Sequence, residues 1–139
     1  MKKEINVYSI SDSLGGTSQK LLSAVTAQYP DIIFNNSYRF PFINQEEELL
    51  DILYDALKDN ALVISTLVNS QLASVAREFS QKNGLAYLDL MHPFFEIIEE
   101  KTGTRPIEVP GTLHRLDSDY FKKISAIEFT VKYDDGKAP

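Results

Sequence analysis

A short run of hydroxyl-bearing and glycine residues follows the first apolar segment of the chain. Residues 11–18 read SDSLGGTS, and apolar residues then recur at helical spacing from Leu21 to Tyr29. Where a strand, a tight glycine turn and a helix follow one another, free N–H groups and the positive end of the helix dipole point at one spot. Glycines and hydroxyls let a phosphate come close. The run predicts an anion-binding loop that contains Ser11, Ser13, Gly15, Gly16 and Thr17.

The alternative is a turn that only reverses the direction of the chain. The loop contains neither GxGxxG nor GxxxxGK[ST], so it carries no standard nucleotide-binding fingerprint. The local residues leave both interpretations open.

Three charged residues fall near predicted strand ends, and each has a structural alternative. Asp12 could bind magnesium or orient a hydroxyl, or it could cap the first helix or the turn. Arg39 could clamp a phosphate with its planar fork, or form a surface salt bridge. Asp89 could act as a general base or cap the helix that follows it.

The remaining chemistry of the chain is sparse. His92 and His114 are the two histidines, and they share no ligand spacing on one helix, so no metal site is predicted. There is no GxSxG motif and no Ser/His/Asp triad can be assigned. A phosphate-receiver domain would need an aspartate at the end of the third strand, where this chain has Ser65 and Thr66.

Strand and helix patterns alternate along the chain. Apolar runs predict strands at 5–10, 32–38, 61–65 and 85–88, and helical spacing predicts helices at 17–29, 45–58, 70–82 and from His92 to Thr102. Pro30 is expected to stop the first helix, and Pro41 the second strand. Residues 118–132 fit a helix, although 127–133 also alternate like a strand; we expect a helix.

Four strand–helix units indicate an α/β fold: a mostly parallel four-stranded sheet with helices on both faces, three-layered and Rossmann-like. Ligands of such sheets bind beyond the carboxyl ends of the strands, where the strand order reverses. The loop 11–17, Arg39, Thr66, Asp89 and His92 all fall at predicted strand ends. This shared edge favours a binding site more than any single residue does.

Composition narrows the class of protein. The 139 residues suit one domain with a core, and the net charge of −6 argues against sequence-independent binding of nucleic acid. The chain has no cysteine, which excludes disulfides and thiolate chemistry and fits a reducing cytoplasm. No signal peptide or membrane span is predicted. Six acidic residues between 46 and 59 are interpreted as the solvated face of a helix.

Several strings taken together resemble one family. They are YSISDSLGGTS at 8–18, RFPFI at 39–43, LDLMHPFFEIIEEKTG at 88–103, PGTLHRLDSDYF at 110–121 and AIEFTVKYDDGK at 126–137. They resemble the amino-terminal half of the regulatory proteins of pyruvate, phosphate dikinase and phosphoenolpyruvate synthetase, in order and over nearly the whole chain.

The resemblance implies a bifunctional cytoplasmic enzyme. One activity is a serine/threonine kinase that uses ADP as donor and inactivates the dikinase or synthetase by phosphorylating a threonine. The other uses inorganic phosphate to remove that phosphoryl group and releases pyrophosphate. The implied partner is one of these two enzymes, with Mg²⁺ as a further cofactor.

The sequence departs from the family pattern in three places. Family members carry a GxxxxGK[ST] loop beyond the DDGK segment, and this sequence reaches Pro139 without one, so we expect residues 1–139 to be a single amino-terminal domain that is inactive alone. The family loop usually reads SDSTGETA, where this chain has Leu14 and Gly16. His92 replaces a glycine and is expected to narrow the pocket.

The resemblance also implies roles for particular residues. Asp12 and Asp89 are the expected catalytic residues, Asp89 as base or magnesium partner, and Arg39 neutralises charge. His114, Arg115 and Asp117 would face the same cleft or dock the partner enzyme. Exposed Phe40, Phe42 or Phe94 could form a homodimer patch. Two alternatives remain: a docking module without chemistry, and an unrelated phosphate-binding domain.

Overall fold

Strands and helices alternate strictly over residues 3–110, the part of the chain that the computed structural model describes. The strands are β1 (Lys3–Ser11), β2 (Ile32–Phe40), β3 (Leu62–Thr66) and β4 (Ala86–Asp89). The helices are α1 (Gly16–Thr26), α2 (Glu46–Lys58), α3 (Ser70–Asn83) and α4 (His92–Thr102). Every strand and helix predicted within this range is present.

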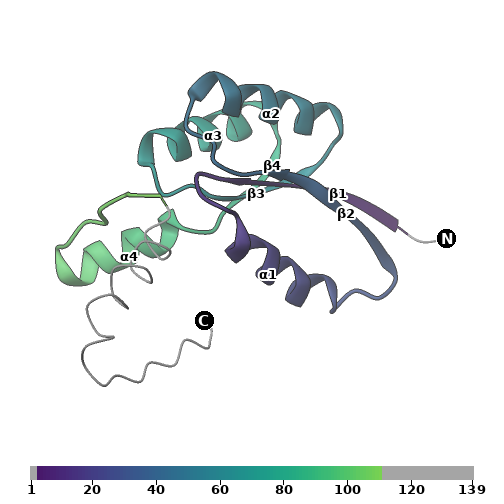
Figure 1. The fold of residues 1–139 in the computed structure, drawn as a ribbon, viewed down its shortest axis with the longest axis horizontal. Helices are drawn as coiled ribbons and strands as arrows, with labels where there is room; N and C mark the ends of the chain where they lie inside the picture. Colours follow the sequence, from purple (N-terminus) through teal and green to yellow (C-terminus); the bar gives the residue numbers. More distant parts are fainter. Residues whose placement is uncertain (1–2, 111–139) are drawn as a thin grey trace, which may run out of the picture.

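The four strands form one parallel sheet in the order β2-β1-β3-β4. Helices α2 and α3 lie on one face, and α1 and α4 lie on the other (Figure 1). The predicted three-layer α/β fold is confirmed, and the sheet is parallel throughout. From β1 the chain continues to β2 on one side and then crosses to β3, which lies on the other side of β1. The strand order therefore reverses between β1 and β3.

The core is divided by the sheet into two unequal parts. Tyr8, Ile10 and Val63 face α2 and α3 in the larger cluster, whereas Val7 and Ile64 pack with Leu22 of α1 in the smaller one. This alternation is the period of two that a strand imposes on its side chains. β3 contributes to both clusters, as expected of a strand buried on both faces.

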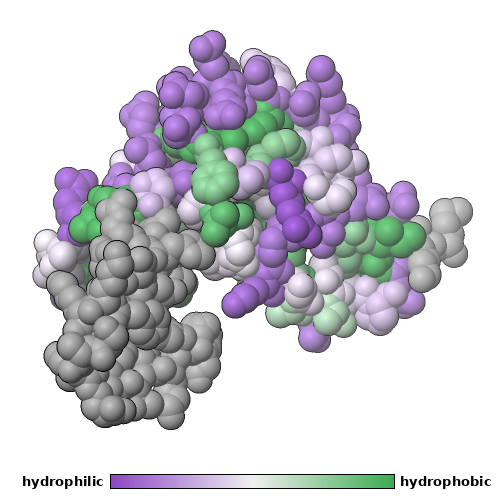
Figure 2. Space-filling view, in the orientation of Figure 1, coloured by the Kyte–Doolittle hydropathy of each residue, from purple (hydrophilic) through white to green (hydrophobic). Residues whose placement is uncertain are grey.

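Helix α2 shows why periodicity predicted the helices well. Leu49, Ile52, Leu53 and Ala56 are buried. The acidic residues between 46 and 59 are all exposed, which confirms that they form a solvated face. The surface over α2 and α3 is accordingly mostly hydrophilic in Figure 2.

One predicted element end was wrong, and one strand extends further toward its predicted stop. α1 ends at Thr26 rather than Tyr29, because Gln28 and Tyr29 donate to carbonyls only three residues back and so leave the helical pattern before Pro30. β2 continues past Tyr38, since Arg39 and Phe40 pair with Ser9 and Ile10 of β1, and it ends directly before Pro41, which confirms the predicted stop. The residues around position 40 do not by themselves show which strand they will pair with.

The three phenylalanines expected on the surface differ in how exposed their side chains are. Phe42 is 58% and Phe94 is 68% exposed. Phe40 is half-buried, packs against the larger core cluster and lies 5.5 Å from the Tyr8 ring, so the prediction was wrong for it. The expected helix at 118–132, and His114, Arg115 and Asp117, lie outside the described residues. No helix within 3–110 has the length and apolar character to cross a bilayer.

Candidate active site at the carboxyl edge of the sheet

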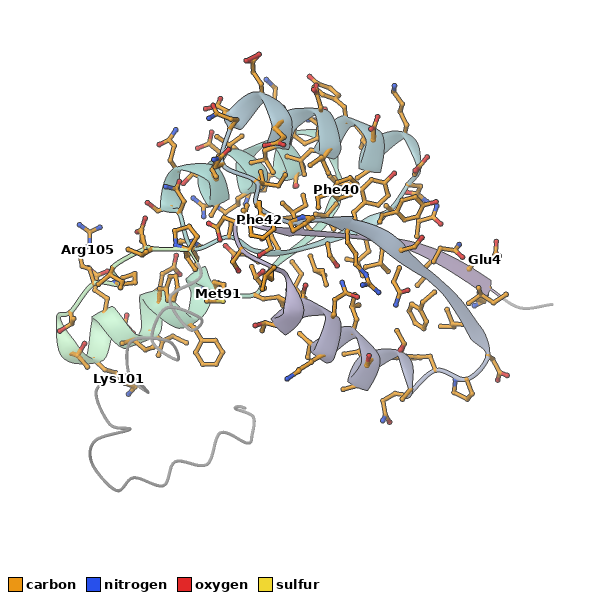
Figure 3. The ribbon with its side chains drawn as sticks, in the orientation of Figure 1. Glu4, Phe40, Phe42, Met91, Lys101 and Arg105 are labelled. Atoms are coloured by element: carbon orange, nitrogen blue, oxygen red, sulfur yellow. The ribbon has the colours of Figure 1, made fainter. Side chains whose placement is uncertain are left out.

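Parallel pairing brings the ends of all four strands to one edge. Ser9 pairs with Arg39, Ser11 with Thr66, and Ser65 with Asp89. Phe40, Phe42 and Met91 lie at this end of the sheet, and Glu4 lies at the opposite end (Figure 3). The predicted gathering of the loop 11–17, Arg39, Thr66, Asp89 and His92 at one edge is confirmed.

Asp12 bridges the point where the strand order reverses. It follows β1 directly, and its Oδ2 accepts hydrogen bonds from the backbone N–H groups of Val68, at 2.9 Å, and Asn69, at 3.2 Å. These two residues connect β3 to α3. Of the interpretations left open for Asp12, capping of α1 or of its own turn is not what these hydrogen bonds show, because both donors lie in the loop after β3, more than fifty residues away.

The other oxygen of Asp12 is in an unfavourable environment. The residue is 7% exposed, and nothing within residues 3–110 hydrogen-bonds to Oδ1. Burial raises the pKa of Asp12 above its ordinary value, although the N–H groups of Asn69 and Val68 and the nearby His92 oppose the rise. A buried carboxyl with an unused oxygen is suited to accept a proton or a donor from a ligand.

The loop between β1 and α1 is held by backbone contacts. The Ser11 Oγ accepts from the Ser13 N–H at 3.0 Å. The Phe42 and Ile43 N–H groups donate to the Ser13 and Ser11 carbonyls, at 3.0 and 2.9 Å, and tie the loop to the end of β2. Gly15 has φ 85°, a left-handed conformation that favours glycine.

Among the four helices of the described residues, α1 alone has neither a side chain that accepts from its first N–H groups nor an acidic first turn. Gly15 supplies no side-chain cap, and the first turn of α1 contains no acidic residue. By contrast, the first turn of α2 contains three glutamates, and the side chains of Asp12 and Asn69 accept hydrogen bonds from N–H groups at the start of α3. The N-terminus of α1 is therefore the one most favourable to an anion.

Arg39 lies beside this helix end. It is exposed, makes no ion pair with any residue in the described range, and lines a cavity of about 20 Å³ with Ser11, Gly15 and Ser18. The alternative of a surface salt bridge therefore has no support within residues 3–110, and the charge of Arg39 is available to a ligand. This cavity has room for about one water molecule, so a phosphate would bind at its mouth rather than inside it.

A larger cavity, of about 300 Å³, lies on the α2 and α3 side of Asp12. Its lining combines polar and apolar side chains from the ends and starts of the neighbouring elements: Asp12, Ile43, Asn44, Glu46, Asn69, Gln71, Leu72 and Pro110.

Asp89 and His92 both have structural partners. The Asp89 Oδ1 accepts from the N–H groups of Met91, at 2.9 Å, and His92, at 3.0 Å, which confirms the helix-cap interpretation. The His92 Nε2 lies 2.9 Å from the Leu67 carbonyl, and the ring packs against Phe95. His92 is not among the lining residues of the two cavities described above, and the expectation that it narrows the pocket stays a prediction.

Two residues near the site were missed by the sequence reasoning. Asn69 caps α3 by accepting from the Leu72 N–H, and an asparagine just before a helical apolar pattern is a detectable signal. Glu108, with φ 55°, accepts from the Ser70 N–H at 2.8 Å. No local signal marks this contact, because 38 residues separate its partners.

Comparisons with known proteins agree with the resemblance. The sequence profile of the kinase/pyrophosphorylase family matches residues 7–139. Proteins named pyruvate, phosphate dikinase regulatory protein from Streptococcus sanguinis (strain SK36) and Streptococcus gordonii (strain Challis) are 88% and 87% identical over all 139 residues. One from Enterococcus faecalis (strain V583) is 68% identical over the same length. The chain spans 51% to 52% of these relatives' lengths, about half.

Proposed function

The chain belongs to the kinase/pyrophosphorylase family, and on this basis we propose that it forms part of an enzyme that switches pyruvate, phosphate dikinase off and on. The kinase activity transfers a phosphoryl group from ADP to a threonine of the dikinase. The reverse switch uses inorganic phosphate to remove that group and releases pyrophosphate. Phosphoenolpyruvate synthetase is the alternative partner, and the cytoplasm is the proposed location.

The arrangement around Asp12 is the observation that supports this proposal best. Phosphoryl transfer needs a positioned acceptor, neutralised phosphate charge and a group that takes the acceptor's proton. Asp12 is a buried carboxyl with a raised pKa and an oxygen that has no partner within residues 3–110. The start of α1, which has no side-chain cap, and Arg39, which makes no ion pair in the described range, lie at the same edge of the sheet. It is proposed to accept the proton of the threonine hydroxyl.

The phosphoryl group is proposed to bind at the start of α1. Gly15, Gly16 and Thr17 would offer backbone N–H groups, and Ser11 and Ser13 would offer hydroxyls. Arg39 would neutralise the charge. The nucleotide phosphates would be held by the part of the enzyme that corresponds to the other half of the relatives, so residues 1–139 are proposed to be inactive alone.

The remaining assignments extend the same proposal. Mg²⁺ would neutralise the phosphates of ADP, and Asp89 would serve as a second base or magnesium partner through the carboxylate oxygen that does not cap α4. His114, Arg115 and Asp117 would face the cleft or dock the partner enzyme. Exposed Phe42 and Phe94 are proposed to contribute to a homodimer contact.

The test uses the full-length gene product with purified pyruvate, phosphate dikinase and labelled ADP. We expect ADP-dependent phosphorylation of a dikinase threonine, and phosphate-dependent removal that releases pyrophosphate. Arg39→Gln is expected to lower both rates by about tenfold to a hundredfold, because it removes charge stabilisation of the transferred group. Arg77→Gln is the matched control, since Arg77 is an exposed arginine on α3.

Two results would overturn the proposal. Absence of transfer with either the dikinase or the synthetase would leave a docking module without chemistry. Equal rates for the Arg39 and Arg77 variants would remove Arg39 from the site.

A further inference from the structure

The cavity of about 300 Å³ beside Asp12 differs in charge from the start of α1. Two carboxylates, those of Asp12 and Glu46, line it, and none of the lining residues within 3–110 is a lysine, arginine or histidine. Glu47 and Glu48 are exposed in the same first turn of α2. Among the described residues, this lining favours a cation over a phosphate.

The start of α3, which borders the cavity, offsets little of this negative charge. Val68 and Asn69 donate their N–H groups to Asp12, and Ser70 donates to the Glu108 carboxylate at 2.8 Å. Three of the N–H groups that could bind an anion at the start of α3 are therefore already used by the chain's own carboxylates.

The hydrogen bonding of Asp12 also indicates that a donor is missing. The residue is 7% exposed, yet its Oδ1 has no hydrogen-bond partner within the described residues. A buried carboxylate oxygen without a donor is unfavourable, and native structures rarely keep one. A positively charged donor in the cavity would compensate the burial of this carboxyl.

Apolar groups in the lining identify the kind of cation. Ile43 and Leu72 are buried and Pro110 lies beside them at the cavity. Lysine and arginine pack their aliphatic stems along such surfaces while the charged head reaches a carboxylate. The apolar lining beside the two carboxylates therefore favours an organic cation with an aliphatic stem.

We propose that this cavity binds a lysine or arginine side chain of the protein partner, which Asp12 and Glu46 recognise. The inference rests on the proposed function only in taking a protein as the partner. It adds a specificity requirement: the partner segment carries a basic residue that enters on the α2 and α3 side of Asp12. Asn44, Asn69 and Gln71 supply neutral hydrogen-bonding groups around it.

The test measures binding of two capped peptides to the full-length gene product. One is acetyl-Ala-Ala-Arg-Ala-Ala-amide; the other replaces arginine with citrulline, which keeps the shape and removes the charge. Backbone NMR shifts give the affinities and the site. We expect shifts at 43–46 and 69–72, and binding of the citrulline peptide about tenfold weaker, because the charge-assisted contacts are lost.

Two matched variants locate the contact. Glu46→Gln is expected to weaken arginine-peptide binding by about fivefold. Glu47→Gln, which makes the same charge change in the same helical turn but outside the cavity lining, is expected to change it by less than about twofold. Both positions are exposed, so folding is not at risk.

Three results would overturn the inference. They are equal affinity for the arginine and citrulline peptides, equal effects of the two glutamine variants, and adenosine binding that shifts the same amides and depends on Glu46. The last would assign the cavity to a nucleoside. These outcomes are independent of catalysis: a protein that binds the peptide as expected but transfers no phosphoryl group would keep this inference and lose the proposed function.

Discussion

Asp12 has both a structural and a proposed chemical role at the residue scale. One carboxylate oxygen joins the loop after β1 to the loop after β3, and the other has no partner among residues 3–110. The two roles can be separated by substitution, because asparagine retains an acceptor oxygen but cannot ionise.

We therefore expect Asp12→Asn and Asp12→Ala to differ in stability. Alanine leaves the Val68 and Asn69 N–H groups without their acceptor and should lower the free energy of unfolding by about 2 kcal/mol or more. Asparagine can still accept both bonds and should stay within about 1 kcal/mol of the native chain at neutral pH. Both variants should lower the phosphoryl-transfer rate of the full-length protein by about a hundredfold or more. Chemical denaturation and the transfer assay measure the two effects.

The control is Asp31→Asn, which removes one charge at an exposed position away from the site. The sign of the pH dependence gives a second check. Because the folded pKa of Asp12 is raised, its contribution to stability is present at acidic pH and is lost as pH rises through that pKa. This loss should disappear in Asp12→Asn. An asparagine variant with full activity would exclude Asp12 as the proton acceptor.

Tyr87 provides a prediction at high pH. Burial, with a smaller contribution from Asp89, raises its pKa from 10.0 to about 12, and the Ser65 hydroxyl at 2.7 Å from its oxygen opposes the rise. The unfolded chain ionises first, so stability should fall between pH 10 and 12. Tyr87→Phe should reduce this fall relative to Tyr54→Phe, which changes an exposed tyrosine. Denaturation at several pH values measures it; equal falls in the two variants would contradict the burial of Tyr87.

At the scale of elements, two adjacent glycines at the start of α1 have different roles. Gly15 has φ 85°, and an added Cβ would lie 3.7 Å from the Ser11 Cβ; Gly16 lies in the helix with nothing within 4 Å of that position. Gly15→Ala should destabilise the fold by about 1–2 kcal/mol through its left-handed backbone. Gly16→Ala should be neutral or stabilise by up to about 1 kcal/mol. Thermal denaturation of both variants checks this, and equal effects would contradict the turn geometry.

Helices and strands were predictable where the pattern that specifies them lies within their own residues. The α2 pattern predicted residues 45–58 and the helix occupies Glu46–Lys58, since its buried stripe and exposed acids repeat every turn. Pro41 correctly predicted where β2 stops, whereas the strand conformation of Arg39 and Phe40 depends on their pairing with β1. The same pairing explains why Phe40 is packed against Tyr8 instead of exposed.

At the scale of the whole molecule, α4 has an apolar face that the described residues do not bury. Phe94, Ile97 and Ile98 are 68%, 52% and 49% exposed at helical spacing. If the homodimer forms through this face, Phe94→Asp should shift the full-length protein toward monomer in sedimentation. Tyr54→Asp, on α2 and 54% exposed, is the control. A dimer that persists in Phe94→Asp, or a native protein that is monomeric, would exclude this contact.

The sequence by itself determined the alternation of strands and helices, the parallel sheet and the shared edge at which the loop 11–17, Arg39 and Asp89 lie. These features follow from side-chain periodicity and from the geometry of a parallel sheet, both of which depend on residues close together in the chain. The family was also identifiable from its ordered motifs.

Only the tertiary structure decided what each site residue contacts. It paired Asp12 with Val68 and Asn69, placed Glu108 at the start of α3, and turned His92 toward the Leu67 carbonyl. Each of these contacts joins residues 25 or more positions apart. Their partners are chosen by which strands become neighbours in the sheet, and that choice is made by packing of the whole domain rather than by any local pattern.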